Sequence, residues 1–304
     1  MMKAMILAAG RGKRLRPITD VYPKVLVPVA NKPMIERTIN FLTFHGVQEI
    51  IVNAYHRYQM IIDYLRECDP LGIRVEIRVE EELLGTGGGI KNTQDFWDKK
   101  PFIVINGDIL TDINMREVYE YHIERSNMVT MVLCDFPVYN KVITDQEMNI
   151  LSIGSGTNVK GALAFTGIHV INPEVLNFIP ENRRYDIIDC YKNLIKKKKH
   201  VRAYLATGQR WRDIGTVGDY LGSNLEFLHQ EKRAVDQDCT IDPGAALEDW
   251  AVIGKRSTIE RSALVKRSVL WDDVTVKEGV RVIDSVVTSG VVIEQDLVDG
   301  VAIK

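Results

Sequence analysis

The sequence predicts an α/β protein in which a Rossmann-like, mostly parallel sheet is followed by a short parallel β-helix. From residue 3 to about residue 230, short apolar, β-rich runs alternate with helix-like segments. This alternation is typical of βαβ units around a sheet that is covered on both faces. After about residue 230, helix signals are few, β-branched residues are frequent, and apolar residues recur every six positions. A six-residue period is the signature of a parallel β-helix.

The alternating region gives its elements in order along the chain. The runs that read as strands are Lys3–Leu7, Glu49–Val52, Arg74–Val79, Phe102–Ile105 and Met128–Leu133. Apolar residues at helical spacing predict helices over Asn31–His45 and Gln59–Cys68, and Val217–Lys232 also looks like a long helix. Near-continuous apolar strands such as FIVI fit a doubly covered sheet. We therefore expect an α/β domain over residues 1–233, with 217–233 as its linking helix, and a β-helix over residues 234–304.

The C-terminal repeat falls into two registers. Its apolar residues lie six apart in one series and, after a phase shift, in another: Ile241, Leu247, Ile253, Ile259, Val265 and Trp271, then Val274, Val280, Val286 and Val292. Each rung of a β-helix points one such side chain inward. At roughly 18 residues per triangular coil, the region gives about three and a half coils.

Composition excludes several classes of protein. The chain has 304 residues and a formal net charge of −2, which argues against a general nucleic-acid binder. It lacks a run of about 18 apolar residues, so no membrane span is predicted. The stretch Ala4–Ala9 is followed by basic residues where a signal peptide would need its cleavage site, so it reads as a first strand. Scattered cysteines indicate reduced thiols and a cytoplasmic protein: Cys68, Cys134, Cys190 and Cys239.

The segment after the first strand combines glycines with basic side chains. Gly10 and Gly12 would let backbone N–H groups approach an anion closely. Against the single acid Asp20, residues 11–24 hold cations that can donate charge-assisted hydrogen bonds to phosphate: Arg11, Lys13, Arg14, Arg16 and Lys24. A solvated basic loop would explain the charge but not the glycines. Leu15 stands where a dinucleotide fingerprint needs its third glycine, and the P-loop pattern is absent.

This segment closely resembles the signature of the sugar-1-phosphate nucleotidyltransferases, roughly L-A-[AG]-G-x-G-[ST]-R-L-x-P-[LI]-T-x-x-x-P-K-x-L-x-P. The matching positions are Leu7, Ala8, Ala9, Gly10, Gly12, Arg14, Leu15, Pro17, Ile18, Thr19, Pro23, Lys24, Leu26 and Pro28. Lys13 departs from the usual serine or threonine. The resemblance covers residues 3–230, and long members of the family carry a left-handed β-helix tail.

Further segments resemble the family's motifs in the expected order. Residues 80–90, EEELLGTGGGI, look like a loop whose glycines let backbone lie against the nucleobase. Residues 102–108, FIVINGD, form a buried strand that ends in an acid, which suits a metal ligand in an open α/β site. Residues 165–173, FTGIHVINP, look like the sugar-site strand, and residues 211–220, WRDIGTVGDY, carry a second acid.

The resemblance implies that a sugar 1-phosphate oxygen attacks the α-phosphorus of a nucleoside triphosphate. Arg14 and Lys24 are the implied catalytic residues, since two anions must approach each other. Asp108 and Asp213 would hold Mg²⁺. Contacts to the nucleotide are implied for Leu7, Ala9, Gly10, Gly12, Lys13, Arg14, Glu80, Gly85, Thr86 and Gly107. Contacts to the sugar are implied for Gly88, Lys160, Thr166 and Gly167.

Two substrate pairs remain open. A carboxylate accepts two hydrogen bonds and donates none, so Glu80 fits the paired N1–H and N2–H₂ donors of guanine. This favours GTP with mannose 1-phosphate or a related sugar, as in the mannose-1-phosphate guanylyltransferases. The alternative is UTP, because N-acetylmuramate-1-phosphate uridylyltransferases share the GTGGG and FTGI-like segments. Like residues 150–162 here, they also lack the Glu-Lys-Pro motif of many members.

Three rival functions are less well supported. A bifunctional acyltransferase would need a histidine base on its solenoid, and none of the six histidines lies in residues 239–304. A non-catalytic regulatory paralogue would lack the key residues, which are all present here: Arg14, Lys24, Asp108 and Asp213. A nucleic-acid binder is disfavoured by the charge and by the lack of aromatic interleaving. Because short solenoids have open ends, we expect a homo-oligomer that associates through the β-helix.

Overall fold

The computed structural model describes residues 2–68, 72–154, 160–228 and 230–304, and the chain forms two compact units. Unit 1 comprises Met1–Gly10 and Ile35–Trp211, and unit 2 comprises Arg11–Met34 and Arg212–Lys304. The units do not divide at residue 233 as expected, because residues 11–34 pack with the β-helix and belong to unit 2. The division into domains at that residue stays a prediction.

The sheet of unit 1 is mixed, with a parallel half and an antiparallel half. Its main path runs β10-β9-β11-β6-β1-β4-β5, and β8 joins β11 to β12. β1 is parallel to β4 and β6, as expected, whereas β11 is antiparallel to β6 and β8. The strands are β1 (Met2–Leu7), β4 (Val47–Ala54), β5 (Arg74–Val79), β6 (Phe102–Asn106), β8 (Val129–Cys134), β9 (Asn140–Thr144), β10 (Ile150–Ile153), β11 (Leu163–Ile171) and β12 (Val201–Leu205).

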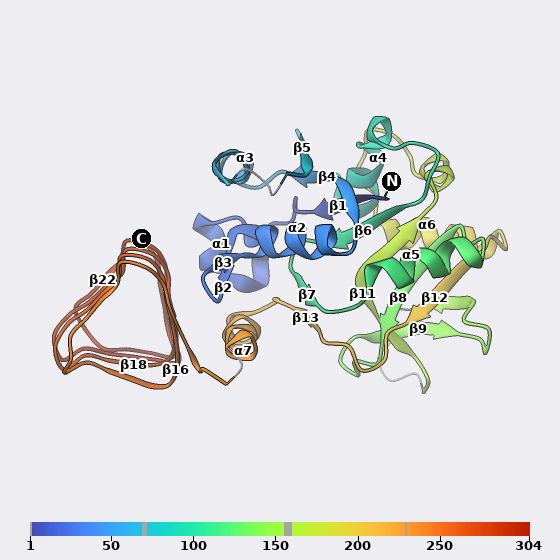
Figure 1. Ribbon diagram of the computed structural model, residues 1–304. Helices are drawn as coiled ribbons and strands as arrows, with labels where there is room; N and C mark the ends of the chain where they lie inside the picture. The colour runs from blue at the N-terminus through green and yellow to red at the C-terminus, as the bar shows by residue number, and fades with distance from the viewer. Residues whose placement is uncertain (1, 69–71, 155–159, 229) are drawn as a thin grey trace. The chain divides into compact units, whose positions relative to one another are not determined.

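Helices cover this sheet because its strands are apolar on both faces. One core cluster joins Met5 and Val104 of the sheet to Ile90 of α4 and Leu194 of α6, all fully buried. α5 contacts β8 and β11, and the layers are visible in Figure 1. The helices of this region are α2 (Met34–Phe44), α3 (Tyr58–Glu67), α4 (Gly85–Lys91), α5 (Met115–Glu124) and α6 (Ile187–Lys196). Short elements are η3 (Gln94–Phe96), β7 (Ile109–Thr111) and η4 (Pro173–Phe178).

Unit 2 begins with the basic segment, which forms several short elements. These are η1 (Lys13–Leu15), α1 (Ile18–Val21), η2 (Lys24–Leu26), β2 (Pro28–Val29) and β3 (Lys32–Pro33). β13 (Trp211–Asp213) leads into α7 (Val217–Phe227), which is shorter than expected. A capping box between Thr216 and Asp219 fixes the start of α7.

Buried polar contacts hold the basic segment, α7 and the β-helix together within unit 2. The Tyr220 hydroxyl donates to the carbonyl of Pro28 (2.5 Å) and accepts from Trp271 Nε1 (2.9 Å). The ring of Tyr22 meets that of Trp271 edge-on, with centroids 4.8 Å apart. Asn31 Nδ2 donates to the carbonyl of Ile253 (2.8 Å). The β-helix therefore supports the segment that carries the basic motif.

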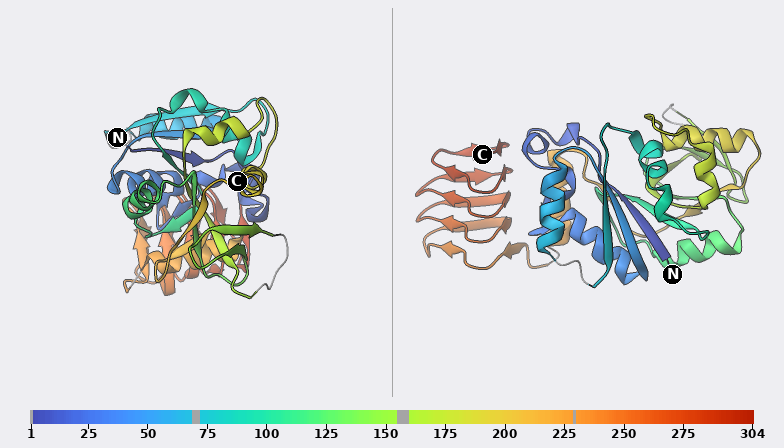
Figure 2. Two further views of the ribbon diagram at one scale, coloured as in Figure 1. Left: turned by 90° about the vertical axis from the view of Figure 1, so that its right-hand side faces the viewer. Right: turned by 90° about the horizontal axis from the view of Figure 1, so that it is seen from above.

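The C-terminal region is a triangular parallel β-helix, seen end-on in Figure 1 and from the side in the right view of Figure 2. Equivalent short strands of successive coils pair in parallel, for example β15 with β17 and β17 with β19. The strands are β14 (Arg233–Val235), β15 (Thr240–Ile241), β16 (Ala246–Ile253), β17 (Thr258–Ile259), β18 (Leu264–Leu270), β19 (Thr275–Val276), β20 (Arg281–Ile283), β21 (Val286–Val287), β22 (Val292–Ile293), β23 (Leu297–Val298) and β24 (Val301–Ala302).

The inward register follows the first predicted series as far as Val265 and leaves it at Trp271, which packs against Tyr22 and Tyr220 while Leu270 lies in the core. The second series points inward at Val274 and Val280, and the core positions then move to Val287 and Ile293. Ile253, Ile259 and Val265 are fully buried in the β-helix core, whereas Val292 is 51% exposed and its neighbour Ile293 is buried. The cause is a change in coil length. Side-chain contacts between neighbouring coils join residues 18, 17 and then 15 apart: Glu248 with Lys266, Arg267 with Asp284, and Arg281 with Asp296. Shorter coils shift the inward position off a strict six-residue period.

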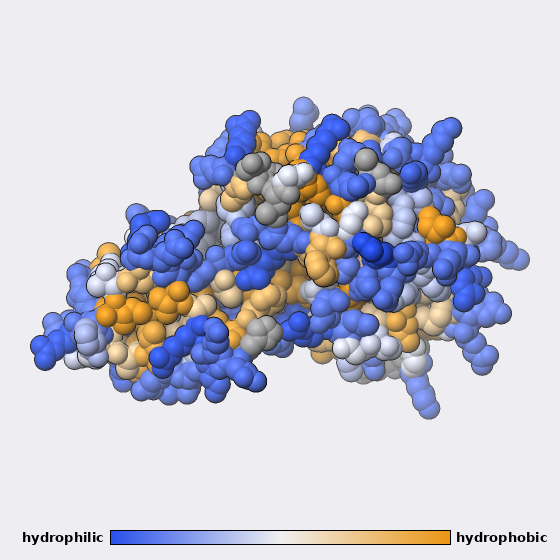
Figure 3. All heavy atoms as spheres, viewed as in Figure 1, coloured by the Kyte–Doolittle hydropathy of each residue, from blue (hydrophilic) through white to orange (hydrophobic). Residues whose placement is uncertain are grey.

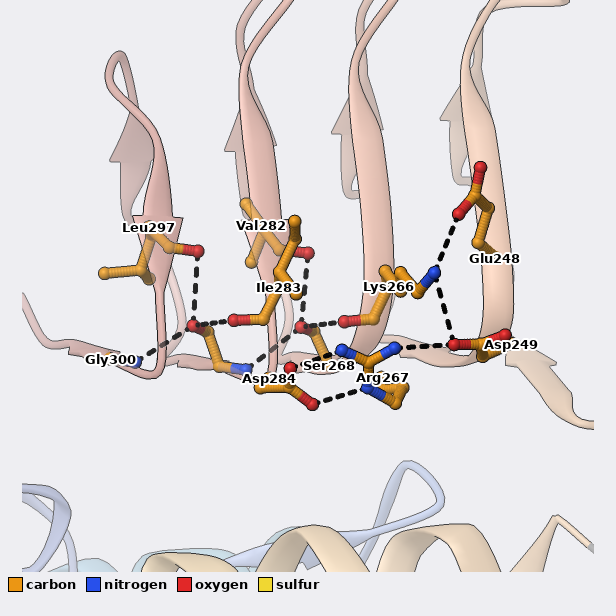
Figure 4. A network of polar contacts seen from close by, with 11 residues as sticks. Glu248, Asp249, Lys266, Arg267, Ser268, Val282, Ile283, Asp284, Leu297 and Gly300 are labelled. Atoms are coloured by element: carbon orange, nitrogen blue, oxygen red, sulfur yellow. Dashed lines mark hydrogen bonds and ion pairs between the residues drawn. The ribbon is translucent and has the colours of Figure 1, made fainter.

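Polar side chains form a column along the β-helix (Figure 4). Arg267 donates to Asp249 on one coil and to Asp284 on the next, with nitrogen–oxygen distances of 2.6 Å. Beside it, the buried Ser268 hydroxyl accepts from the Ser285 N–H (3.1 Å). Ion pairs and stacked hydroxyl groups thus connect successive coils.

At the end of the β-helix that faces the viewer in Figure 3, apolar atoms lie between hydrophilic side chains.

Two expectations about the chain's class can be compared with the structure. Within the described residues, no helix is both long enough and apolar enough to cross a membrane. The cysteines are free thiols rather than disulfides: Cys68, Cys134, Cys190 and Cys239.

Candidate active site

In unit 1, the predicted nucleotide-binding residues gather at the carboxyl ends of parallel strands. β1 lies between β4 and β6, where the strand order reverses, and such switch points are the usual ligand sites of open α/β sheets. The carbonyl of Leu7, at the end of β1, accepts from the N–H of Gly107, which follows β6, at 2.9 Å. Asp108 comes next and is half-buried. Leu7, Gly107 and Asp108 therefore lie together, as the motifs predict.

In unit 2, Gly12 has a steric role and takes a left-handed conformation (φ 59°). A Cβ there would lie 2.8 Å from Thr19 Cγ2, so a side chain would collide with α1. The Thr19 hydroxyl and the Leu15 N–H both donate to the Gly12 carbonyl at 2.9 Å. Gly12 thus shapes the turn that presents the basic side chains.

Gly10, the other glycine of the motif, lies in unit 1 beside Ala9. A Cβ at Gly10 would meet nothing within 4 Å, so packing within the protein does not explain this glycine. Ala9 is buried, whereas Gly10 is exposed. Close approach of a ligand to this backbone remains the predicted reason for Gly10.

The two predicted catalytic cations converge on one predicted metal ligand within unit 2. Arg14 donates to Asp213 Oδ2 at 2.9 Å, and Lys24 Nζ lies 3.4 Å from Asp213 Oδ1. The Arg14 side chain is 57% exposed, whereas Lys24 and Asp213 are 13% and 19% exposed. A Cβ at Gly215 would lie 2.7 Å from the Arg14 guanidinium, so that glycine makes room for it. Lys13 is exposed beside this cluster in sequence.

The glycine-rich helix α4 packs against the protein's own backbone. The N–H groups of Gly87 and Gly88 donate to the carbonyl of Tyr185 at 2.9 and 3.1 Å. Gly85 has a left-handed φ of 71°, and a Cβ there would lie 2.9 Å from that same carbonyl. Thr86 accepts from the N–H of Ile187 (3.0 Å). These glycines therefore have a packing reason, and contact of Gly85, Thr86 or Gly88 with substrate stays a prediction.

Glu80 lies just after β5 and is only 3% exposed. Its Oε1 accepts from Asn53 Nδ2 at 2.6 Å, and its Oε2 accepts from the N–H of Leu84 at 3.0 Å. Burial raises the pKa of the Glu80 carboxyl, and these hydrogen bonds oppose that rise. Protein donors thus occupy both oxygens on which the guanine argument depended. Sequence reasoning missed Asn53, although it ends the apolar run EIIVN much as Asn106 ends FIVIN.

The predicted sugar-binding residues are not equivalent. Thr166 is 1% exposed, and its hydroxyl donates to the carbonyl of Val132 (2.8 Å), so this side chain is part of the sheet. Gly167 has a φ of 77°, and a Cβ there would lie 2.5 Å from Asn106 Nδ2. Gly167 therefore lets β11 pass close to the end of β6. Lys160 is exposed in a turn before β11.

The residues present fit a hard divalent cation in their chemistry. Mg²⁺ binds through one or two carboxylates together with substrate phosphates and water, rather than in an all-protein cage. Within the described residues, no group of three or more His, Cys, Asp or Glu side chains is placed to hold a metal. Asp108 and Asp213 belong to different units, and each supplies the carboxylate oxygens that such an ion takes.

Comparison with known proteins gives relatives over most of the chain. A UTP–glucose-1-phosphate uridylyltransferase of Synechocystis sp. is 32% identical over 254 residues, which cover 77% of this chain and 65% of that protein. The chain thus spans slightly less than two thirds of this relative's length. A mannose-1-phosphate guanylyltransferase of Mycobacterium tuberculosis is 25% identical over 301 residues, which cover 91% of this chain and 81% of that protein.

Solved structures and family models agree with this result. The structure of HddC from Yersinia pseudotuberculosis complexed with GMP-PN superposes with a TM-score of 0.66 at 26% identity, covering 75% of this chain and all of that one. Residues 227–304 match a family described as GlmU-like, C-terminal hexapeptide, which is consistent with a left-handed β-helix. Residues 3–230 match the family model described as nucleotidyl transferase, and the chain therefore belongs to that family.

Proposed function

We propose that this protein is a sugar-1-phosphate nucleotidyltransferase that forms a nucleoside-diphosphate sugar and releases pyrophosphate. The observation that carries this proposal is the convergence of Arg14 and Lys24 on Asp213, beside the turn shaped by Gly12. Two neighbouring cations of this kind would suit a site at which two phosphate groups must meet. The names of the relatives, which are uridylyl- and guanylyltransferases acting on sugar 1-phosphates, support the same reaction class.

The chemistry requires charge neutralisation and positioning rather than a protein nucleophile. An oxygen of the sugar 1-phosphate attacks the α-phosphorus, a new P–O bond forms, and the bond between the α-phosphorus and the bridging oxygen breaks as pyrophosphate leaves. Arg14 stabilises charge on the triphosphate and in the transition state. Lys24 holds the sugar phosphate beside the α-phosphate. The exposed guanidinium of Arg14 is accessible to a ligand, whereas Lys24 is fixed by burial.

Enzymes of this family generally use a divalent metal ion. We propose Mg²⁺, held by Asp108 and Asp213, because carboxylate oxygens are its preferred protein ligands. When bound, the ion would neutralise phosphate charge and help to orient the two substrates. The ion pairs of Asp213 with Arg14 and Lys24 would then have to rearrange or be shared.

The best-supported substrates are GTP and mannose 1-phosphate or a related sugar, with a UTP-dependent uridylyltransferase as the alternative. Several relatives that are aligned over about nine tenths of this chain are mannose-1-phosphate guanylyltransferases. The uridylyltransferase relative has the higher identity, 32%, over a shorter alignment. Because Glu80 is buried, the preference for GTP rests on these relatives and not on a direct contact with the base.

The test is a matrix of GTP, UTP, dTTP, CTP and ATP against mannose, glucose, N-acetylhexosamine, muramate and heptose 1-phosphates with Mg²⁺. Pyrophosphate release is measured for each pair, with omission of either substrate as the control. Turnover with one nucleotide and one sugar class would establish the reaction and name its substrates. Binding of nucleotides without turnover across the matrix would support the non-catalytic regulatory paralogue instead.

We also propose a cytoplasmic homo-oligomer that associates through the β-helix. The last strands carry exposed apolar side chains, including Val298 (51% exposed) and Ile303 (37% exposed). An open coil end also presents backbone groups that can pair with another chain. Light scattering at several protein concentrations tests this, and Val298→Asp is expected to shift the protein toward the monomer. A wild-type protein that is monomeric at all concentrations would contradict it.

A further inference from the structure

Two buried polar side chains connect the ends of three neighbouring strands in unit 1. In the parallel register, Leu7 of β1 is paired with Asn53 of β4, and Asn53 with Arg78 of β5. Glu80 follows β5, and its N–H donates to the carbonyl of Ala54 at 2.8 Å. Asn53 and Glu80 are 2% and 3% exposed. Buried polar groups at this depth are costly unless they are fully hydrogen-bonded, so their contacts define their role.

A continuous chain of hydrogen bonds, which we call the relay, runs through Asn53 and Glu80. The N–H of Ala8 donates to Asn53 Oδ1 at 2.9 Å, Asn53 Nδ2 donates to Glu80 Oε1 at 2.6 Å, and the N–H of Leu84 donates to Glu80 Oε2 at 3.0 Å. Both ends are backbone donors, which need acceptors. This fixes the orientation of the Asn53 amide and requires two acceptor oxygens at position 80.

The peptides at the two ends belong to the two segments that the motifs assign to the nucleotide. Ala8 immediately precedes Ala9 and Gly10, and Leu84 immediately precedes α4. The carbonyl of Leu84 accepts from the N–H of Tyr185 at 2.8 Å, so its peptide is held on both sides. The chain of hydrogen bonds therefore sets the distance between these two backbone segments.

Gly89 gives an independent reason to regard this pair as a built contact. A Cβ at Gly89 would lie 2.7 Å from both Asn53 Nδ2 and Glu80 Oε1. Contacts this short essentially never occur, so α4 can lie against the pair only because residue 89 has no side chain. The last glycine of GTGGG is thus explained by the Asn53–Glu80 contact.

We propose that Asn53 and Glu80 are positioning residues that hold the backbone after β1 and the start of α4 at the separation that a nucleoside triphosphate requires. This inference rests on the proposed function and deepens it. In this proposal neither side chain touches the substrate, because the backbone segments at the two ends of the relay are the ones that the motifs assign to the nucleotide. The relay therefore contributes to affinity for every nucleotide that the site accepts, and it does not distinguish guanine from uracil.

The decisive experiment exchanges the hydrogen-bond donor of residue 53 with an acceptor of residue 80. Glu80→Gln leaves one acceptor oxygen where two are needed, so the new amide NH₂ faces either Asn53 Nδ2 or the N–H of Leu84, which are both donors. Asn53→Asp places a carboxylate oxygen against Glu80 Oε1. In the double variant Asn53→Asp, Glu80→Gln, residue 53 accepts at both oxygens while residue 80 donates once and accepts once, so every hydrogen bond is restored. We expect each single variant to raise the KM for nucleotide by about tenfold or more, and the double variant to recover most of that loss.

The controls separate a relay from a direct contact. Glu81→Gln, a change of the same chemistry at an exposed neighbour, is expected to leave the KM unchanged. Gly89→Ala, which keeps both partners but crowds them, is expected to raise the KM as Glu80→Gln does. Direct recognition of the base by Glu80 predicts a changed GTP-to-UTP preference in Glu80→Gln and no recovery in the double variant; that result would overturn the relay.

Thermal unfolding and nucleotide binding test the relay even when no turnover can be measured. The relay predicts that the double variant unfolds at a temperature closer to the wild type than either single variant, so a double variant less stable than both singles contradicts it. Absence of turnover by the wild type across the substrate matrix would refute the proposed function alone. The relay would then be judged by the Kd for GTP and UTP, measured by calorimetry with the same variants.

Discussion

The polar groups of the candidate site are of two kinds, and they differ in exposure and in partner. In segment 11–24 the cation of Arg14 is more than half exposed and meets a carboxylate. In the sheet of unit 1, Asn53, Glu80 and Thr166 are almost fully buried, and all three bond to backbone or to each other. Exposed charge is available to a ligand, whereas a buried polar group is committed to the protein. Substitutions of the two kinds should therefore fail in different ways.

The largest effect on activity is expected at Arg14. Arg14→Ala removes a cation from the phosphates but breaks only an exposed ion pair, so kcat/KM should fall by about 10²–10³-fold while the unfolding temperature barely changes. Steady-state pyrophosphate release and thermal unfolding measure the two quantities. Arg16→Ala is the matched control, because the Arg16 side chain is equally exposed and pairs with Asp20 at 3.0 Å. Equal losses of kcat/KM in the two variants would show that the overall positive charge of this segment, and not Arg14 itself, supports the reaction.

A smaller loss is expected at Asp213, which has several roles at once. Asp213→Asn keeps the size of the side chain but removes the charge that meets Arg14 and Lys24. We expect kcat to fall by about 10²-fold and the Mg²⁺ concentration for half-maximal rate to rise, since a neutral amide is a poorer ligand for a hard cation. A magnesium titration of the rate measures both. Asp219→Asn, which alters the capping box of α7, serves as a stability control; an unchanged magnesium dependence in Asp213→Asn would contradict the proposed ligand.

The sequence anticipated the cluster of charged side chains better than the network of buried, uncharged hydrogen-bonding groups and Glu80. Arg14, Lys24 and Asp213, which the motifs assign to one site, lie together in the structure. The roles of Asn53 and Glu80 could not be read from the sequence. A hydrogen bond between residues 27 positions apart depends on the register of β4 and β5, which no local pattern encodes. Contact between Glu80 and the base stays a prediction.

The fold shows the same division between local and long-range information. The alternation of strands and helices and the six-residue repeat were sufficient to predict a sheet and a β-helix. They did not predict the antiparallel half around β11, because strand direction is a tertiary property. They also missed the shortening of the later coils that turns Val292 outward, and the packing of segment 11–34 with the β-helix through Tyr220 and Trp271.

A buried hydroxyl in unit 2 should affect stability rather than chemistry. Tyr220→Phe leaves the carbonyl of Pro28 and the indole N–H of Trp271 without their partner in a fully buried position. The expected cost is about 1–3 kcal/mol, or roughly 2–4 °C in the unfolding temperature for each kcal/mol. Tyr204→Phe, at a half-buried hydroxyl that donates to Glu117 (3.3 Å), is the control and should cost less. Equal shifts in the two variants would mean that the buried Tyr220 hydroxyl contributes no more to stability than a partly exposed one.

The smallest effect is expected at Arg267 in the column of Figure 4, whose side chain is partly exposed (36%). Hydrogen bonds from Arg267 lower the pKa of Asp249 and of Asp284. A carboxyl group whose pKa is lower in the folded state stabilises the fold above its unfolded pKa of about 3.9, and this contribution disappears as the pH falls through the folded value. Arg267→Ala should therefore lower the unfolding temperature slightly at pH 7, less in 1 M salt, and not at all once both carboxyl groups are protonated. Arg261→Ala, at an exposed arginine of the β-helix, provides the comparison. A loss at Arg267 that persists at low pH and high salt would mean that its side chain stabilises the β-helix by packing and not by its charge.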